Sequence, residues 1–180
     1  ISGLVLIVVI TLFSGGNIGD LINNVSNYTI DNSNYSANFT PSKKEEEDLE
    51  FVSVVLGYSE DIWREIFNGM GKTYNNPKLV VFRNSVQSAC GFQNSATGPF
   101  YCPADEKVYI DLGFYEELSV KFNAPGDFAM AYVIAHEVGH HVQQQLGLSD
   151  QVRQIQSEVG QTEQNQWTVR MELHIMYKIN

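Results

Sequence analysis

The sequence has little positive charge and little cysteine, and each shortage excludes a class of protein. Its 180 residues include 11 lysines and arginines against 21 aspartates and glutamates, so the formal net charge is −10. A chain this acidic repels the phosphate backbone, and its basic residues form no stripe, so we predict no nucleic-acid binding. The only cysteines, Cys90 and Cys102, form no CxxC pair and cannot complete a structural zinc site without two further ligands.

The sequence also lacks an apolar run long enough to cross a membrane unaided. Residues 3–13 read GLVLIVVITLF, whereas a complete spanning helix needs about 20 apolar residues. We interpret residues 1–14 as a partial transmembrane anchor, with the apolar core of a cleaved signal peptide as the alternative. Residues 15–42 are rich in asparagine and serine and are expected to form an exposed linker. Both interpretations predict export of the remaining chain.

Export bears on the two cysteines, because an oxidising compartment allows disulfides to form and persist. We therefore expect Cys90 and Cys102 to form a disulfide, with two free buried thiols as the alternative.

The region 43–180 has the composition of an ordinary globular domain, because 43% of the whole chain is hydrophobic. Acidic residues followed by an apolar run indicate a helix start near Lys43. Gly57 is expected to interrupt this helix and Ser59 to cap a new one. The other expected elements are a strand at 79–82, a strand at 107–111 and a short helix at 116–122. We predict an α+β domain with a small antiparallel sheet.

The strongest chemical signal is an HExxH motif inside a predicted helix. Residues 127–147 read DFAMAYVIAHEVGHHVQQQLG, with Asp127 suited to begin the helix and Gly147 to end it. Residues four apart lie only about 40° apart around a helix, so His136 and His140 can bind one zinc ion. Glu137 lies beside them, where it can act as the general base toward a zinc-activated water.

The residues around the motif are apolar, which gives the motif more weight than the pattern alone. Two histidines and a glutamate in a buried helix need polar partners, and a metal ion supplies them. A pair of hydrogen-bonded core histidines is the alternative. His141 lies about 100° from His140 around the helix, so we expect it to point elsewhere, as a surface or supporting histidine.

A catalytic zinc site uses three protein ligands, so the third must come from downstream. Glu172 and His174 are the candidates, and they lie about 200° apart on a helix, so only one can face the metal. Glu158 and Glu163 are weaker alternatives in polar stretches. The residues alone leave the choice between Glu172 and His174 open.

From about residue 45 to residue 173, the chain resembles the bacterial family described as putative neutral zinc metallopeptidases. The resemblance rests on FVSVVL followed by EDIW at 51–63, KTYNNPKLVVF at 72–82, SVQSACG at 85–91, GPFYCPADEKVYIDL at 98–112 and FNAPGDFAMAYVIAHEVGHHVQ at 122–143. It implies a membrane-anchored, zincin-like domain on the extracytoplasmic side of a bacterial envelope. It also implies zinc as cofactor, a peptide or protein substrate, and Glu172 as the third ligand.

The resemblance stops after Leu173. The family pattern leads us to expect Gln-Ala-Asp-Cys, whereas this chain has His-Ile-Met-Tyr at 174–177. Met176 therefore stands where an aspartate supporting the metal ligands is expected. We interpret 43–180 as a C-terminally truncated zinc metallopeptidase domain. The alternatives are a non-catalytic cell-surface binding module on a zincin scaffold, and a structural zinc protein.

Two further parts of the site are predicted more broadly. Zincin relatives bind an extended peptide along a strand edge, and the strand at 107–111 or the one at 79–83 is a candidate for this role. Three tyrosines are candidates for stabilising the oxyanion, although each also fits a core position: Tyr101, Tyr109 and Tyr132.

Overall fold

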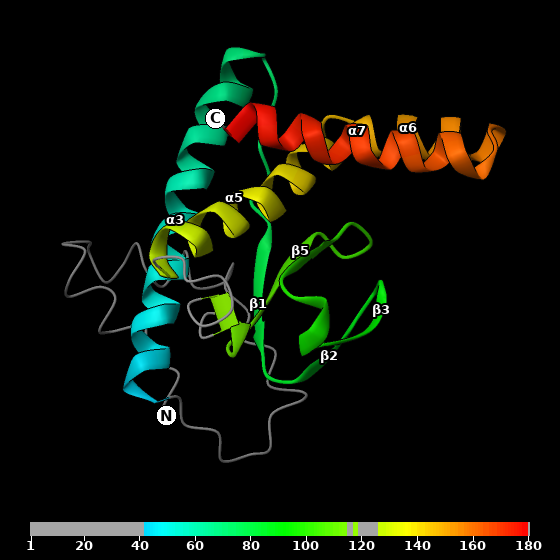
Figure 1. Cartoon of the computed structure of the whole chain (residues 1–180). Helices are drawn as coiled ribbons and strands as arrows, with labels where there is room; N and C mark the ends of the chain where they lie inside the picture. Colours follow the sequence, from blue (N-terminus) through cyan, green and yellow to red (C-terminus); the bar gives the residue numbers. More distant parts are fainter. Residues whose placement is uncertain (1–41, 115–116, 119–125, 180) are drawn as a thin grey trace.

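The computed structural model describes residues 42–114, 117–118 and 126–179, which form an α+β fold (Figure 1). The helices are α3 (Lys43–Gly69), the short 3-10 helix η3 (Ser95–Thr97), α5 (Gly126–Gln145), α6 (Leu148–Glu158) and α7 (Gln161–Ile179). The strands are β1 (Lys78–Phe82), β2 (Ser85–Ser88), β3 (Gly91–Asn94), β4 (Phe100–Cys102) and β5 (Lys107–Asp111). Both predicted strands and the HEVGH helix are thus present.

Helix α3 begins one residue after Ser42, as its acidic start predicts. The Ser42 hydroxyl accepts a hydrogen bond from the Glu45 backbone N–H, and the Glu45 carboxylate accepts one from the Ser42 N–H at 2.7 Å. This reciprocal pair is a capping box. The predicted break at Gly57 is wrong, because the Ser59 hydroxyl donates to the Val55 carbonyl within one continuous helix. A single glycine costs a helix only about 1 kcal/mol, which packing overcomes.

The main sheet has the strand order β1-β5-β4, and its pairing corrects the antiparallel prediction. β1 and β5 are parallel, in register from Lys78 opposite Lys107 to Phe82 opposite Asp111. Within this sheet, only the β4–β5 pair is antiparallel. Residues 83–106 separate β1 from β5, and a connection of that length lets two strands run in the same direction. The positions of β1 and β5 were predicted from the sequence, but their parallel pairing was not.

A disulfide joins the second, smaller sheet to the first. β2 and β3 form an antiparallel hairpin, and Ser88 and Gly91 are the last facing pair before its turn. Cys90 lies in this turn and is bonded to Cys102, the last residue of β4. The predicted disulfide is therefore confirmed, and it fixes the hairpin turn to β4.

Helix α5 lies at the centre of the fold and contacts α3, α6, α7 and β4. Met130, Ile134, Val138 and Val142 form a row at a spacing of four residues, and all four are buried in the main core. The core partners from the other elements are Leu49, Val52, Leu56, Phe67, Tyr74, Leu79, Val81, Val108, Ile110, Leu112 and Leu118. Helices α6 and α7 extend side by side from the end of α5 (Figure 1).

Several sequence predictions fall outside the described part of the chain. The anchor at 1–14, almost all of the linker at 15–42 and most of the short helix at 116–122 lie there. Within the described ranges, no helix combines the length and the apolar character needed to cross a membrane.

Candidate metal centre

The two histidines of the HEVGH motif lie on the same face of α5, as their spacing predicts. The ring centroids of His136 and His140 are 4.9 Å apart, with the ring planes nearly perpendicular at 88°. Helix α7 brings Glu172 to them, with its Oε2 3.0 Å from His136 Nε2 and 3.6 Å from His140 Nε2. One ligand-type atom from each residue lies within 4.8 Å of the other two. All three side chains remain partly exposed.

Gly139, inside the motif, allows α7 to approach α5 this closely. A Cβ atom at Gly139 would lie 2.6 Å from Cγ2 of Ile175, closer than real Cβ contacts allow. Ile175 is 2% exposed and lies one turn beyond Glu172. The contact between Gly139 and Ile175 therefore sets the distance between the helix that carries the histidines and the helix that carries the glutamate.

Glu137, next to His136, is turned into the protein toward β4. Its side chain is 8% exposed and accepts a hydrogen bond from the Tyr101 backbone N–H. Burial raises the pKa of the Glu137 carboxyl to about 8, opposed by this hydrogen bond and reinforced by the charge of Glu172. The carboxyl can therefore exchange a proton near neutral pH.

The protonation state of His140 suits metal binding. Burial lowers the pKa of His140, against the opposing effect of the Glu172 charge, so its imidazole is neutral at neutral pH. Nδ1 of His140 lies 3.3 Å from the amide oxygen of Gln143. Nδ1 of His136 is buried and has no hydrogen-bond partner among the described residues. The ring of Tyr132 lies against His136, with centroids 6.4 Å apart.

His141 points away from the metal ligands, as predicted, but it is wholly buried and not at the surface. Its Nδ1 lies 3.0 Å from the Tyr101 hydroxyl, and its Nε2 lies 2.6 Å from the Asn75 carbonyl oxygen. Burial lowers the pKa of His141, which keeps the ring neutral. The ring links α5 to the strand that contacts Glu137, a role that sequence reasoning missed because Tyr101 lies 40 residues away.

The other candidate residues are arranged less favourably for a metal. His174 has its Nδ1 3.4 Å from the Gln143 amide nitrogen and is not in the group of converging ligand atoms. Glu158 and Glu163 are exposed and are likewise outside that group. The hydroxyl of Tyr109 donates to Asp105 and that of Tyr101 lies 3.0 Å from His141, whereas the ring of Tyr132 lies against the candidate ligand His136.

The strand edges also distinguish the two predicted peptide-binding strands. β5 is paired on both sides, so the strand at 107–111 has no free edge. β1 and β4 are the outer strands of this sheet. β4 is the outer strand that contacts Glu137, through Tyr101.

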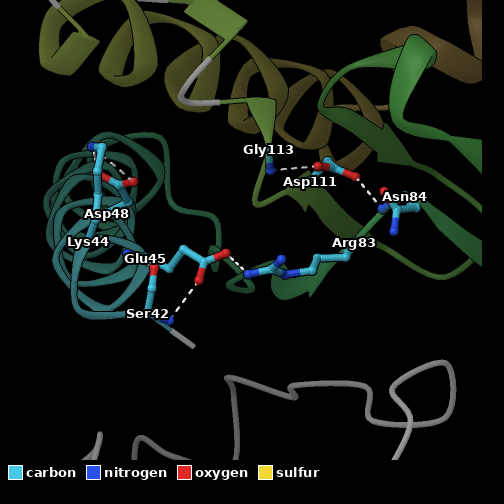
Figure 2. A network of polar contacts seen from close by, with 8 residues as sticks. All are labelled: Ser42, Lys44, Glu45, Asp48, Arg83, Asn84, Asp111 and Gly113. Carbon is cyan, nitrogen blue, oxygen red and sulfur yellow. Dashed lines mark hydrogen bonds and ion pairs between the residues drawn. The ribbon is translucent and has the colours of Figure 1, made fainter. Parts of the chain in front are cut away.

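A second polar cluster lies between the start of α3 and the loop after β1 (Figure 2). Arg83 pairs with Glu45, while the buried Asp111 carboxylate accepts from the Asn84 N–H at 2.8 Å and the Gly113 N–H at 2.6 Å. These residues line an open cavity of about 440 Å³ that includes none of the three converging metal-ligand residues. The Arg83–Glu45 pair joins the first turn of α3 to the residue that follows β1, and the Asp111 hydrogen bonds join the ends of β1 and β5.

Comparison with known proteins shows which family this chain belongs to. The chain is 46% identical over 172 residues to the uncharacterized protein YpfJ of Escherichia coli K12, covering 96% of this chain and 59% of YpfJ. It is 40% identical over 103 residues to the uncharacterized protein Rv2575 of Mycobacterium tuberculosis, covering 56% of this chain and 34% of that protein. The chain thus spans about 59% of the length of the Escherichia coli relative.

No solved structure matches the chain. A family model described as "Putative neutral zinc metallopeptidase" matches residues 1–176, nearly the whole sequence, and the chain belongs to that family.

Proposed function

We propose that this chain is a zinc-dependent metallopeptidase domain in which His136, His140 and Glu172 hold the metal and Glu137 is the general base. The observation that carries the proposal is the convergence of three ligand-type atoms, from two elements, within 4.8 Å of one another. The membership of the zinc metallopeptidase family supports it independently.

The three side chains fit zinc by their chemistry. Imidazole nitrogens and carboxylate oxygens are zinc ligands, and catalytic zinc sites use three protein ligands and leave a fourth position open. Burial favours neutral His140, so its ring nitrogen has a lone pair available for a metal. Partial exposure of His136, His140 and Glu172 leaves the site open to solvent.

The bound zinc would supply Lewis-acid chemistry, polarising the scissile carbonyl and lowering the pKa of a coordinated water. The residues of this chain supply the proton transfer. Glu137 accepts a proton from the attacking water and passes it to the leaving amine. The Tyr101 N–H stabilises the carboxylate form that must accept the proton, because it donates a hydrogen bond to it.

A peptide or protein is the substrate that this chemistry implies. An extended peptide can add to the free edge of a sheet, where main-chain hydrogen bonds hold it. We place it along β4, because β4 is an outer strand and contacts Glu137. The disulfide between Cys90 and Cys102 supports a location outside the cytoplasm, on the extracytoplasmic side of a bacterial envelope.

One observation favours the alternative, a cell-surface binding module without catalysis. Histidines that bind metals almost always donate their second ring nitrogen to an acceptor. Nδ1 of His136 has no such acceptor in the described part of the chain, and Met176 stands where the family pattern leads us to expect an aspartate. A zinc ligand held this loosely would weaken the metal site and favour the binding role.

The experiment that separates these functions measures zinc content and peptide hydrolysis of the full 180-residue chain and of two variants. We expect one zinc per chain, bound more weakly in Glu172→Ala and retained in Glu137→Gln, with hydrolysis lost in both. Glu163→Ala, an exposed glutamate at the start of α7, is the matched control and should behave like the unmodified chain. In the unmodified chain, zinc without hydrolysis, or no zinc at all, would refute the peptidase proposal and favour the binding module.

A further inference from the structure

A buried glutamine, Gln143, joins the two helices of the metal centre. Gln143 lies on α5 one turn after His140 and is 1% exposed. Its amide oxygen lies 3.3 Å from His140 Nδ1, and its amide nitrogen donates to the Met171 carbonyl of α7 at 2.9 Å. Met171 immediately precedes Glu172, so one side chain contacts both a candidate ligand and the backbone beside another.

The Met171 carbonyl fixes which way the Gln143 amide points. A backbone carbonyl only accepts hydrogen bonds, so the group facing it must be the amide NH₂ of Gln143. The amide oxygen must then face His140, and this oxygen also only accepts. It follows that Nδ1 of His140 carries the hydrogen. The lone pair of the neutral ring is therefore on Nε2, the nitrogen that faces Glu172.

The same amide also makes a contact with His174. Its nitrogen lies 3.4 Å from His174 Nδ1, so the second N–H of Gln143 is directed at α7 as well. The His174 ring therefore lies beside Gln143, whereas Glu172 of α7 faces the two histidines. Every polar group of the Gln143 amide is thus directed at His140 or at α7.

We propose that Gln143 is the positioning residue of the metal centre: it sets the ring tautomer of His140 and holds the turn of α7 that carries Glu172. The first half of this proposal concerns the metal-free chain, and the second rests on the proposed zinc site. Because the amide is buried, with Gln143 only 1% exposed, solvent does not replace its contacts when it is removed. Substitution of a residue that supports a metal ligand typically lowers metal affinity about 10–100-fold.

The neighbouring Gln144 provides a matched control on the same helix. Its amide oxygen accepts from Arg153 on α6, and no hydrogen bond within the described part of the chain joins its side chain to His140 or α7. Gln143→Met and Gln144→Met remove the same amide from adjacent positions and substitute the same flexible side chain. Gln143→Glu is the conservative variant, because a carboxylate still accepts from His140 but cannot donate to the Met171 carbonyl.

The first test is ¹⁵N NMR of the histidine rings in the metal-free 180-residue chain near neutral pH. We expect His140 in the unmodified chain and in Gln144→Met to carry its hydrogen on Nδ1, and Gln143→Met to show a mixture of tautomers. A role confined to packing would leave the tautomer unchanged. Hydrogen on Nε2 of His140 in the unmodified chain would overturn the proposal, and this result does not depend on whether the chain binds zinc or cleaves peptides.

The second test measures zinc affinity by competition with a chelator of known affinity. Gln143→Met should bind zinc at least tenfold more weakly, Gln143→Glu should lie between it and the unmodified chain, and Gln144→Met should stay within twofold. Equal zinc affinity of Gln143→Met and Gln144→Met, with both variants folded by circular dichroism, would overturn the role in holding Glu172. Failure of the unmodified chain to bind zinc would refute this half of the proposal together with the proposed function, while the NMR test would still decide the first half.

Discussion

The two polar clusters of this protein use similar side chains for opposite purposes. Between α3 and β1, Arg83 pairs with Glu45, and two backbone N–H groups satisfy Asp111 (Figure 2). At the metal centre, two imidazoles and the Glu172 carboxylate converge, and His140 is held neutral by burial. The first cluster is complete without a ligand. The second gathers electron-pair donors around one point, an arrangement that a cation stabilises.

This difference has a direct consequence for stability. Removing a partner from the first cluster breaks an ion pair or hydrogen bonds that the folded chain makes, so it should weaken folding. Removing a ligand from the second should weaken zinc binding and leave the metal-free fold nearly as stable. Substitutions that reverse this pattern would break the comparison between the two clusters.

The largest effect is expected from Gly139→Ala. The added Cβ would meet Ile175 at 2.6 Å and push α7 away from α5. We expect a stability loss of about 1–3 kcal/mol from overpacking and a zinc affinity at least tenfold lower, measured by chemical denaturation and chelator competition.

A second substitution serves as the control for this prediction. Ile175→Ala in the same chain removes the side chain that the new Cβ would meet, so it should restore most of the zinc affinity. If Gly139→Ala alone bound zinc normally, the close approach of α5 and α7 would not position Glu172.

The second largest effect is expected from Asp111→Ala in the α3–β1 cluster. Asp111 is 4% exposed, and its loss leaves the Asn84 and Gly113 N–H groups without their acceptor. We expect about 1–2 kcal/mol less stability and unchanged zinc affinity. Asp61→Ala, at an exposed residue of α3, should change stability by less than about 0.5 kcal/mol. Loss of zinc from Asp111→Ala would show that the clusters are coupled.

The pH dependence of stability should reveal Glu60, a buried carboxyl outside both clusters. Burial raises its pKa from 4.5 to about 7, and Asn76 donates to it at 2.6 Å. A raised carboxyl pKa means that the folded state binds the proton more tightly, so this stabilisation is complete below pH 4.5 and is lost as pH rises through 7. The loss should amount to about 1–3 kcal/mol.

Urea denaturation of the unmodified chain and of Glu60→Gln, at intervals from pH 4 to pH 8, checks this expectation. As pH rises from 4 to 8, the free energy of unfolding of the unmodified chain should fall relative to that of Glu60→Gln. A constant difference would mean that Glu60 titrates normally in the folded chain.

The smallest effect is expected from Met176→Asp, which sharpens the comparison by adding to the metal centre. Residue 176 lies one helical turn after Glu172, and His136 Nδ1 has no acceptor in the ranges that the structure describes. A carboxylate there should strengthen zinc binding by up to about tenfold. Leu173→Asp, about 100° around α7 from Glu172, is the control and should not strengthen it.

Sequence reasoning located the motif residues because one helix carries them. The spacing of His136 and His140 fixes their relation regardless of the rest of the fold. Sequence reasoning also placed β1 and β5 correctly, but it did not predict that they run parallel, because their relative direction depends on the path of residues 83–106. Gly57 was misread for a similar reason, since packing of α3 outweighs the preference of one residue.

The supporting residues were beyond the reach of local patterns. Gln143 contacts Met171, 28 residues away, and His141 contacts the Tyr101 hydroxyl and the Asn75 carbonyl. No periodicity in the sequence relates such pairs. One signal was available, however. Gln143 lies one helical turn after Gly139 and His140, which places it on the same side of α5 as these two motif residues. A polar residue on a buried side of a helix needs hydrogen-bond partners.

The identity of the metal ligands is tested most directly by zinc K-edge X-ray absorption of the 180-residue chain. We predict nitrogen and oxygen neighbours at about 2.0–2.2 Å, scattering from two imidazole rings, and no sulfur neighbour. In Glu172→Ala, the two imidazoles should remain while zinc binds more weakly. A spectrum with sulfur at about 2.3 Å, or with fewer than two imidazoles in the unmodified chain, would contradict the assignment of His136, His140 and Glu172 as the metal centre.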